Sequence, residues 1–199
     1  MTQEHYQSTI AAFDRANAED PNKEIFEGNT YPKELLYAQR MSQMQERYAP
    51  EASEAVKLAV RAQHIQRWKI PRSEFPMDRQ GYLQWRTGLY RFHAETAGRF
   101  MQEAGYDDAM VARVQSIVSK KGLKVNSETQ LMEDVADLVF IEHYMIGFAS
   151  QHPEYDEAKW IGIIRKTWQK MSSRAHEFAL GGKIKLPEAL APLILKAVN

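Results

Sequence analysis

Residues 70 to 77 read Ile70-Pro71-Arg72-Ser73-Glu74-Phe75-Pro76-Met77, and the two prolines of this stretch decide how the sequence around it folds. Proline lacks an N–H donor and clashes with the preceding helical turn, so a helix that reaches the stretch must end there. Asp78 is a suitable N-cap for a long helix that follows. The sequence therefore predicts an elbow over residues 70–78, with His64 on the helix before it and His93 on the helix after it.

Apolar residues recur at helical spacing through most of the chain, and sustained alternation of the strand type is hard to find. We therefore expect an all-α helical bundle. With 199 residues the chain can bury one sizeable core and is short for two independent domains, so we expect a single domain over residues 1–199 with about eight or nine helices. The first predicted helix ends near Glu19–Asn22, and the next begins at Pro32. Further helices are predicted from Pro50 to Trp68, from Asp78 to Gly105 and from Asp107 to Gly122. A capping box at Ser127 and Gln130 precedes a helix over Leu131–Phe148, an apolar stripe over Trp160–Met171 predicts another, and a closing helix begins at Leu186.

The composition excludes several classes of function. Lys and Arg number 26, as do Asp and Glu, so no global field favours nucleic acid or an anionic membrane. The absence of cysteine excludes disulfides, thiolate zinc sites and a cysteine nucleophile. The N-terminus lacks the features of a signal peptide, and no apolar run is long enough to span a bilayer. We expect a soluble cytoplasmic protein, with a small anionic or phosphorylated ligand as its partner.

The helix after the elbow carries three chemically active residues at seven-residue spacing: Arg79, Arg86 and His93. This spacing keeps them on one stripe of the helix. Tyr82 and Tyr90 lie within one turn of it. Guanidinium groups beside phenolic hydroxyls can bind phosphate or carboxylate, because Arg forms paired hydrogen bonds to these anions. The alternative is a solvated helix face.

Two further positions have both a functional and a structural interpretation. His64 has apolar neighbours one turn away on its helix, so it is either a ligand or a hydrogen-bonded core histidine. Lys120 and Lys121 lie where one helix ends and the Ser127 helix begins, and such a junction can hold an anion. A solvated loop is the alternative there.

From Leu131 to Ile141 the polar residues are Glu133, Asp134 and Asp137, which form one strip on the helix. The positions one turn further are apolar, so we expect the strip to end inside the fold. Buried carboxylates need a cation, a metal ion or several donors. The structural alternative is an ion pair with an arginine of a neighbouring helix.

Four segments carry a family resemblance: Leu35–Met41, Ala62–Arg72, Tyr82–Arg86 and Glu133–Leu138. Together they resemble an uncharacterised family of bacterial and fungal proteins, some of whose members are labelled glutamyl-tRNA synthetase. The tetrapeptide from His64 and the pentapeptide Lys170-Met-Ser-Ser-Arg174 imitate the HIGH and KMSKS signatures of class I synthetases. Those signatures act on a nucleotide-binding parallel sheet. His64 lies in a helical pattern, so we exclude synthetase activity.

In order and spacing, the chain is also distantly similar to the HD-domain metal-dependent phosphohydrolases. Tyr37 falls where the first histidine of that family is expected, and His64 matches the histidine of the His-Asp doublet, with Ile65 in place of its aspartate. Asp134 or Asp137 matches the late aspartate. The resemblance implies an HD-domain-like fold and a divalent metal ion, for which His64, His93, Asp134 and Asp137 are the candidate ligands.

Three functions follow as expectations. The first is metal-assisted hydrolysis of a nucleotide or small phosphorylated metabolite, in which Arg79 and Arg86 neutralise the phosphate. The second is an HD-like module that binds an anionic ligand without turning it over. The third is an interaction protein with exposed aromatic anchors. The sequence names no catalytic residue, substrate or oligomeric state.

Overall fold

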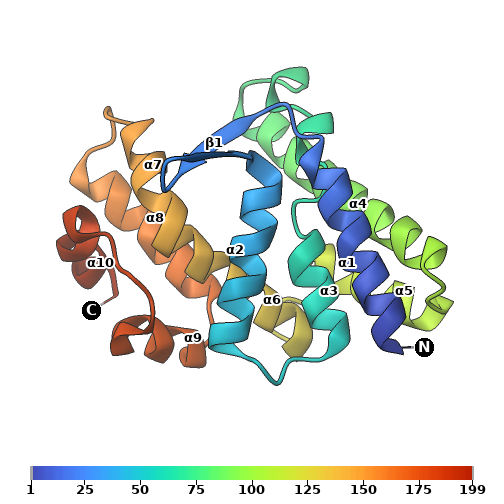
Figure 1. Cartoon of the computed structure of the whole chain (residues 1–199). Helices are drawn as coiled ribbons and strands as arrows, with labels where there is room; N and C mark the ends of the chain where they lie inside the picture. The colour runs from blue at the N-terminus through green and yellow to red at the C-terminus, as the bar shows by residue number, and fades with distance from the viewer. Residues whose placement is uncertain (1, 199) are drawn as a thin grey trace. The chain divides into compact units, whose positions relative to one another are not determined.

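A computed structural model describes residues 2–198 (Figure 1), and it confirms the all-α class. One short β-hairpin is the exception. The chain forms two compact units, of which the first ends at Gly122 and the second begins at Leu123. The single domain expected from the chain length stays a prediction. No helix within residues 2–198 has both the length and the apolar character that crossing a bilayer requires.

The first unit contains five helices and the hairpin within its described residues. Its core consists of side chains that are almost completely buried, among them Phe13, Met41, Leu58 and Met101. Its elements are α1 (Thr2–Ala18), β1 (Lys23–Phe26), β2 (Asn29–Pro32), α2 (Lys33–Tyr48), α3 (Glu54–Ala62), α4 (Arg79–Glu103) and α5 (Asp108–Val118).

The hairpin of β1 and β2 was not predicted. Its strands pair antiparallel from Lys23 opposite Pro32 to Phe26 opposite Asn29. Glu27 and Gly28 both have positive φ angles, 49° and 77°, as a tight two-residue hairpin turn requires. Four residues in each strand are too few to give a recognisable alternation in the sequence.

Helix α3 begins later and ends earlier than expected from Pro50 and Trp68. Ser53 is its N-cap, and the Ser53 hydroxyl accepts a hydrogen bond from the N–H of Val56. The helix ends at Ala62, after which Gln66 adopts a left-handed conformation with φ of 52°. The side chain of Asn17 on α1 accepts a hydrogen bond from the Gln66 N–H at 2.9 Å. This contact between distant segments stabilises the turn, and local sequence does not encode it.

The predicted elbow is present between α3 and α4, where two single 3₁₀ turns replace a continuous helix. The indole N–H of Trp85 donates to the carbonyl oxygen of Ile70 at 2.8 Å and thereby ties the elbow to α4. Asp78 caps α4 as expected and accepts from the N–H of Gly81 at 2.7 Å. A Cβ atom at Gly81 would lie 2.1 Å from the carbonyl oxygen of Pro76, so the close approach requires glycine.

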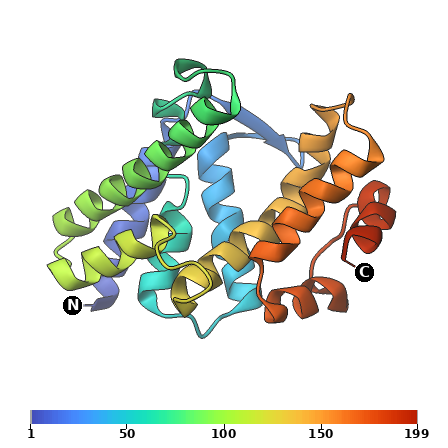
Figure 2. The ribbon, with the colours of Figure 1, turned by 180° about the vertical axis from the view of Figure 1, so that it is seen from behind.

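Helices α4 and α5 lie side by side (Figure 1 and Figure 2). A Cβ atom at Gly98 of α4 would clash with the side chain of Gln115 of α5, so glycine permits this close packing. Asp107 is the N-cap of α5, as predicted, and its carboxylate accepts from the N–H of Met110 at 2.8 Å. Gly105, with φ of 92°, follows the C-cap Ala104 and ends α4.

The second unit contains helices joined by turns and loops, and no strand is present in its described residues. Asn126 caps α6 by accepting from the N–H groups of Glu128 and Thr129, so the predicted cap at Ser127 is wrong by one residue. The predicted helix to Phe148 continues through one π-helical turn at Phe140–Tyr144. The elements are α6 (Ser127–Val139), α7 (Met145–Ser150), α8 (Glu157–Lys170), α9 (Ser173–Phe178) and α10 (Ala191–Val198).

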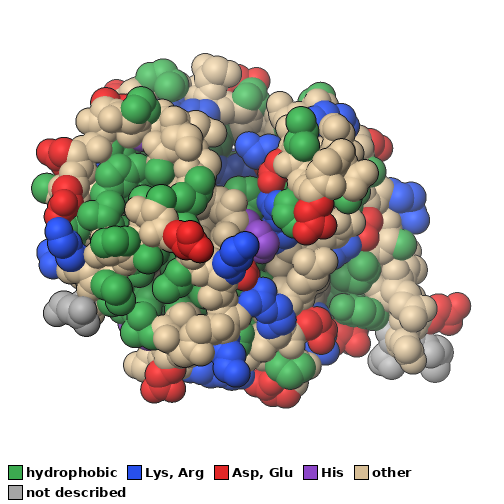
Figure 3. Space-filling model, turned by 60° about the vertical axis from the view of Figure 1, so that its left-hand side comes forward, with side chains coloured by type: hydrophobic (Ala, Val, Ile, Leu, Met, Phe, Trp, Pro, Cys, Tyr) green, Lys and Arg blue, Asp and Glu red, His purple; other side chains and the backbone are tan. Residues whose placement is uncertain are grey.

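Helix α10 packs against α8, as both ribbon views show (Figure 1 and Figure 2). It is preceded by a 3₁₀ turn at Glu188–Leu190, so the predicted closing helix is present and begins five residues after Leu186 at Ala191. Helix α9 was not predicted, because its six residues are too short for a clear apolar stripe. On the surface drawn in Figure 3, acidic and basic side chains are interspersed, which agrees with the formal net charge of zero.

Candidate functional site

One polar cluster in the first unit brings together residues from three parts of its chain. Glu34 and Tyr37 lie on α2. Gln63, His64 and Arg67 lie in the turn that follows α3. Arg86 and His93 lie on α4. The cluster consists of Glu34, Tyr37, Gln63, His64, Arg67, Arg86 and His93.

His64 is held on three sides. Its Nε2 atom lies 2.9 Å from a guanidinium nitrogen of Arg67, and its Nδ1 atom lies 3.3 Å from a carboxyl oxygen of Glu34. The ring stacks on Tyr37 with centroids 4.1 Å apart and an interplanar angle of 16°. Because a guanidinium can only donate, Nε2 must accept, and the proton of the neutral ring is on Nδ1. His64 is thus a neutral imidazole with a defined tautomer.

Basic side chains surround this neutral ring. Burial lowers the pKa of His64 well below 6.5, and the positive charges of Arg67, Lys120, Lys33 and Arg86 lower it further. All these charges act on the ring in the same direction. The neighbourhood of His64 is therefore positively charged although the whole chain is neutral.

His93 lies next to His64, with ring centroids 5.8 Å apart, and only 2% of its surface is exposed. A hydrogen bond to the backbone of Gln63 holds its ring. The Nε2 atom is buried and has no hydrogen-bond partner in residues 2–198. Burial, His64, Arg67 and Lys120 together lower the pKa of His93 well below 6.5, so this ring is also neutral.

The carboxyl group of Glu34 completes the cluster. Burial raises its pKa from 4.5 to about 7, and the charges of Arg67 and Lys33 only partly offset this effect. Glu34 therefore exchanges a proton near neutral pH. Beside a neutral imidazole, such a group can accept or release a proton as a ligand arrives.

The predicted stripe on α4 exists, but its residues differ strongly in exposure. His93 is buried, Arg86 is half-buried and Arg79 is exposed. The guanidinium of Arg86 donates to the hydroxyl of Tyr90 and, at 3.5 Å, to that of Tyr82. The stripe thus runs from the surface into the cluster. Arg79 is at its exposed end and contacts no residue of the cluster in the described part of the chain.

The two lysines predicted to bind substrate also differ. The amino group of Lys120 lies 5.4 Å from the ring centroid of Tyr90, so Lys120 is near Arg86 and contributes charge to the cluster. Lys121 is exposed. Of the six residues predicted to bind substrate, Arg86, Tyr82, Tyr90 and Lys120 therefore lie in or beside the cluster.

Arg67 and Glu34 were not predicted as site residues. Arg67 contacts His64 and lies over the ring of Trp85, with its guanidinium carbon 4.8 Å from the ring centroid. The signal for Arg67 was its place three residues after His64, which is one helical turn. The signal for Glu34 was weak, because a glutamate in the first turn of a helix is usually exposed.

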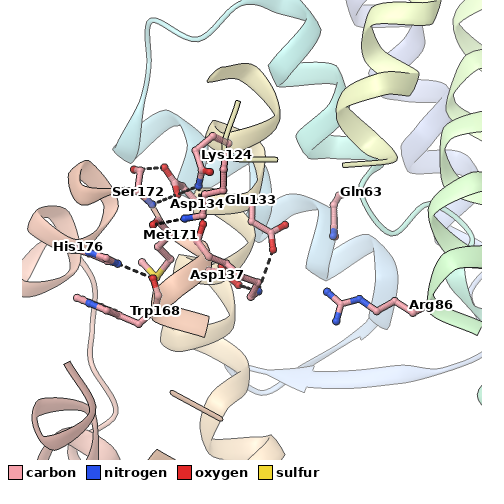
Figure 4. A network of polar contacts seen from close by, with 12 residues as sticks. Gln63, Arg86, Lys124, Glu133, Asp134, Asp137, Trp168, Met171, Ser172 and His176 are labelled. Atoms are coloured by element: carbon pink, nitrogen blue, oxygen red, sulfur yellow. Dashed lines mark hydrogen bonds and ion pairs between the residues drawn. The ribbon is translucent and has the colours of Figure 1, made fainter. Parts of the chain in front are cut away.

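The carboxylate strip lies in the second unit and is buried, as predicted: Glu133, Asp134 and Asp137 are 1%, 2% and 5% exposed. Asp134 accepts hydrogen bonds from the backbone N–H of Ser172 at 2.8 Å and from its hydroxyl at 2.5 Å. Figure 4 shows these contacts at the junction of α8 and α9. Ser172 is also the N-cap of α9, so Asp134 fixes the start of that helix.

Lys170 at the end of α8 provides the positive charge for the strip. Its amino group lies 2.6 Å from a carboxylate oxygen of Asp137 and 3.1 Å from one of Glu133. Despite burial, which lowers the pKa of Lys170, these two carboxylates raise it above its usual value. The predicted structural ion pair is present, but a lysine supplies the cation instead of an arginine.

The metal site proposed for His64, His93, Asp134 and Asp137 stays a prediction. Within residues 2–198, no three His, Asp or Glu side chains are grouped as a metal ion requires. Arg67 occupies the Nε2 atom of His64 and the surroundings are positively charged, so the first unit does not fit a divalent cation.

Comparison with known proteins identifies the family. The sequence profile of the family described as "Domain of unknown function (DUF4202)" matches residues 7–194. The chain belongs to this family. The search of curated proteins and the search of solved structures found no match to this chain. His64 follows α3 and precedes a 3₁₀ turn, so the segment that imitates a synthetase signature lacks the strand on which that signature depends.

Proposed function

We propose that the first unit is a binding module for a small phosphorylated anion, which Arg67 and Arg86 hold beside His64 and His93. One observation carries the proposal. Arg67 and Arg86 are both half-buried, and neither forms an ion pair with a carboxylate in residues 2–198. Their contacts are to an imidazole, to phenol hydroxyls and to aromatic rings.

The free energy of the positive charges supports this function. A cation that is removed from water without a counter-charge is unfavourable, and a bound anion relieves this cost. Arginine is well suited to phosphate because its planar guanidinium donates two parallel hydrogen bonds. The aromatic rings of Tyr90 and Trp85 hold the guanidinium groups in place before a ligand arrives.

The test is calorimetric titration of the whole protein with inorganic phosphate and n-propyl phosphate at low ionic strength. We expect Arg67→Gln and Arg86→Gln each to weaken binding at least about tenfold, which corresponds to about 1.4 kcal/mol. Added salt should weaken binding in the wild type as well. Absence of phosphate binding by the wild-type protein would refute the proposal.

Arg91→Gln is the matched control. Arg91 lies on α4, five residues after Arg86, but it is exposed and its closest acidic partner is Glu95 at 4.0 Å. It also lines a shallow groove of about 500 Å³ on α4 with Leu83 and Thr87. Unchanged phosphate affinity in this variant is expected. A loss as large as that of Arg86→Gln would place the anion in the groove and contradict the proposed site.

Metal-assisted hydrolysis of the same ligand stays a separate prediction, and it has its own measurement. Metal analysis of protein purified without a histidine tag, combined with an assay for phosphate release, tests it directly. Stoichiometric metal that His64→Ala abolishes would favour the hydrolase. Phosphate binding without metal or turnover would favour the binding module.

A further inference from the structure

His93 offers a buried hydrogen-bond acceptor that the proposed anion site does not use. The ring donates to the backbone carbonyl of Gln63, and Nε2 has no partner in residues 2–198, so the bonded nitrogen is Nδ1. A neutral imidazole with its proton on Nδ1 carries a lone pair on Nε2. This atom can therefore accept a hydrogen bond but cannot donate one.

A buried acceptor without a partner is unfavourable by about 1–3 kcal/mol. Such an atom in a folded protein points to a missing ligand group or water. A simple anion cannot supply the partner, because every oxygen of a dianionic phosphate monoester accepts. The positive charges of Arg67 and Lys120 disfavour a cation at this position, whether an ammonium group that donates a hydrogen bond or a metal ion that coordinates the nitrogen. A neutral donor remains, and among small metabolites the hydroxyl group is the usual one.

The acceptor lies close to the anion site. The rings of His93 and His64 are 5.8 Å apart, and Arg67 contacts His64 at 2.9 Å. A small ligand can therefore bring its phosphate to the guanidinium groups and a nearby hydroxyl to His93. A phosphate for the guanidinium groups and a hydroxyl for His93 together select an anion that carries both a phosphate and a hydroxyl group.

We propose that the ligand is a hydroxylated phosphate monoester, such as a polyol or sugar phosphate, whose hydroxyl group donates a hydrogen bond to Nε2 of His93. This inference rests on the proposed function and names the class of its ligand. His93 is then a specificity-determining residue, because it distinguishes hydroxylated phosphates from phosphates on a plain alkyl chain.

The experiment compares sn-glycerol 3-phosphate with n-propyl phosphate, which has the same three-carbon chain and no hydroxyl groups. We expect the wild-type protein to bind glycerol phosphate at least about tenfold more tightly. His93→Leu should remove this preference, because it should weaken the binding of glycerol phosphate at least about tenfold more than the binding of propyl phosphate. His93→Gln, whose amide oxygen can accept a hydrogen bond, should restore part of the preference and keeps the test valid if the leucine variant does not fold.

The outcomes separate the two proposals. If neither phosphate binds to the wild type, the anion site itself is refuted. If both bind with equal affinity, the anion site holds and the role of His93 is refuted, which means that water or nothing occupies its acceptor.

Nitrogen-15 NMR of the histidine rings gives an independent measurement. We expect Nε2 of His93 to be unprotonated both in the free protein and in the glycerol phosphate complex. Protonation of Nε2 on binding would mean that His93 donates directly to the phosphate. That result would overturn the inference.

Discussion

Two of the polar clusters within residues 2–198, one in each unit, differ in the partners of their charged groups. In the second unit, the carboxylates of Glu133 and Asp137 bond to Lys170, and Asp134 bonds to Ser172. In the first unit, Arg67 forms no ion pair with a carboxylate in the described residues, and the Nε2 atom of His93 has no partner there.

The difference indicates which cluster is structural. The carboxylates of the second unit bond to a cation and to hydrogen-bond donors of the same unit, and such contacts stabilise a fold. Groups that stay unmatched cost free energy, and such costs are typical of functional sites. The cluster around His64 thus combines three features of a binding site: neutral imidazoles, a carboxyl with a raised pKa, and guanidinium groups that form no ion pair with a carboxylate in residues 2–198.

The largest expected effect is in the second unit. Lys170→Met removes the cation that bonds to two buried carboxylates, so we expect a loss of about 3 kcal/mol in the free energy of unfolding at pH 7. Urea unfolding followed by circular dichroism measures it. Lys166→Met, one turn earlier on the same helix and exposed, is the control and should cost less than about 0.5 kcal/mol. Equal losses in the two variants would show that the strip does not depend on Lys170.

The second expected effect concerns Glu34 and depends on pH. Because folding raises its pKa from 4.5 to about 7, the folded protein binds an extra proton between these values. Its contribution to stability is therefore lost as the pH rises from 4.5 through 7. Glu34→Gln cannot ionise, so its stability relative to the wild type should increase by about 3 kcal/mol between pH 4 and pH 8.

Urea unfolding at several pH values measures this change. Glu46→Gln is the control, because Glu46 lies on the same helix with a side chain that is 60% exposed. Parallel pH profiles for wild type and Glu34→Gln would mean that Glu34 is not buried as described. The comparison between the clusters would then lose one of its three features.

The smallest expected effect is at Arg86. If its guanidinium serves a ligand and not the fold, Arg86→Met should change the free energy of unfolding by less than about 1 kcal/mol in either direction. The same variant should lose phosphate binding. A loss of stability as large as that of Lys170→Met, measured by the same urea unfolding, would make Arg86 structural and remove the distinction between the two clusters.

Patterns within short stretches of sequence predicted much of the fold. The prolines of the elbow, the caps at Asp78 and Asp107 and the apolar stripe of α8 were all recognised, because each depends on residues within a few positions of one another. The start of α3 was missed because Pro50, a competing start signal, precedes the true cap, Ser53. The hairpin was missed because its strands are only four residues long.

The candidate site was predicted only in part. Regular spacing on one helix placed Arg86 and His93 on a common stripe, and the burial of the carboxylate strip followed from its apolar neighbours. Glu34 was missed because its partner, His64, lies 30 positions away in the chain, and Arg67 was missed because its contact with His64 depends on the turn between them. A turn stabilised by Asn17 brings Arg67 to His64, and the packing of α2 brings Glu34 there.

The sequence by itself determined that the chain is helical, where most helices begin and end, and which residue types are available for chemistry. Only the tertiary structure decided which charges are neutralised and which are not. The physical reason is distance. Helix signals act over one or two turns, whereas the pKa of His64 depends in part on Lys120, Lys33 and Arg86, and Lys170 pairs with Asp137, all more than 20 positions away in the chain.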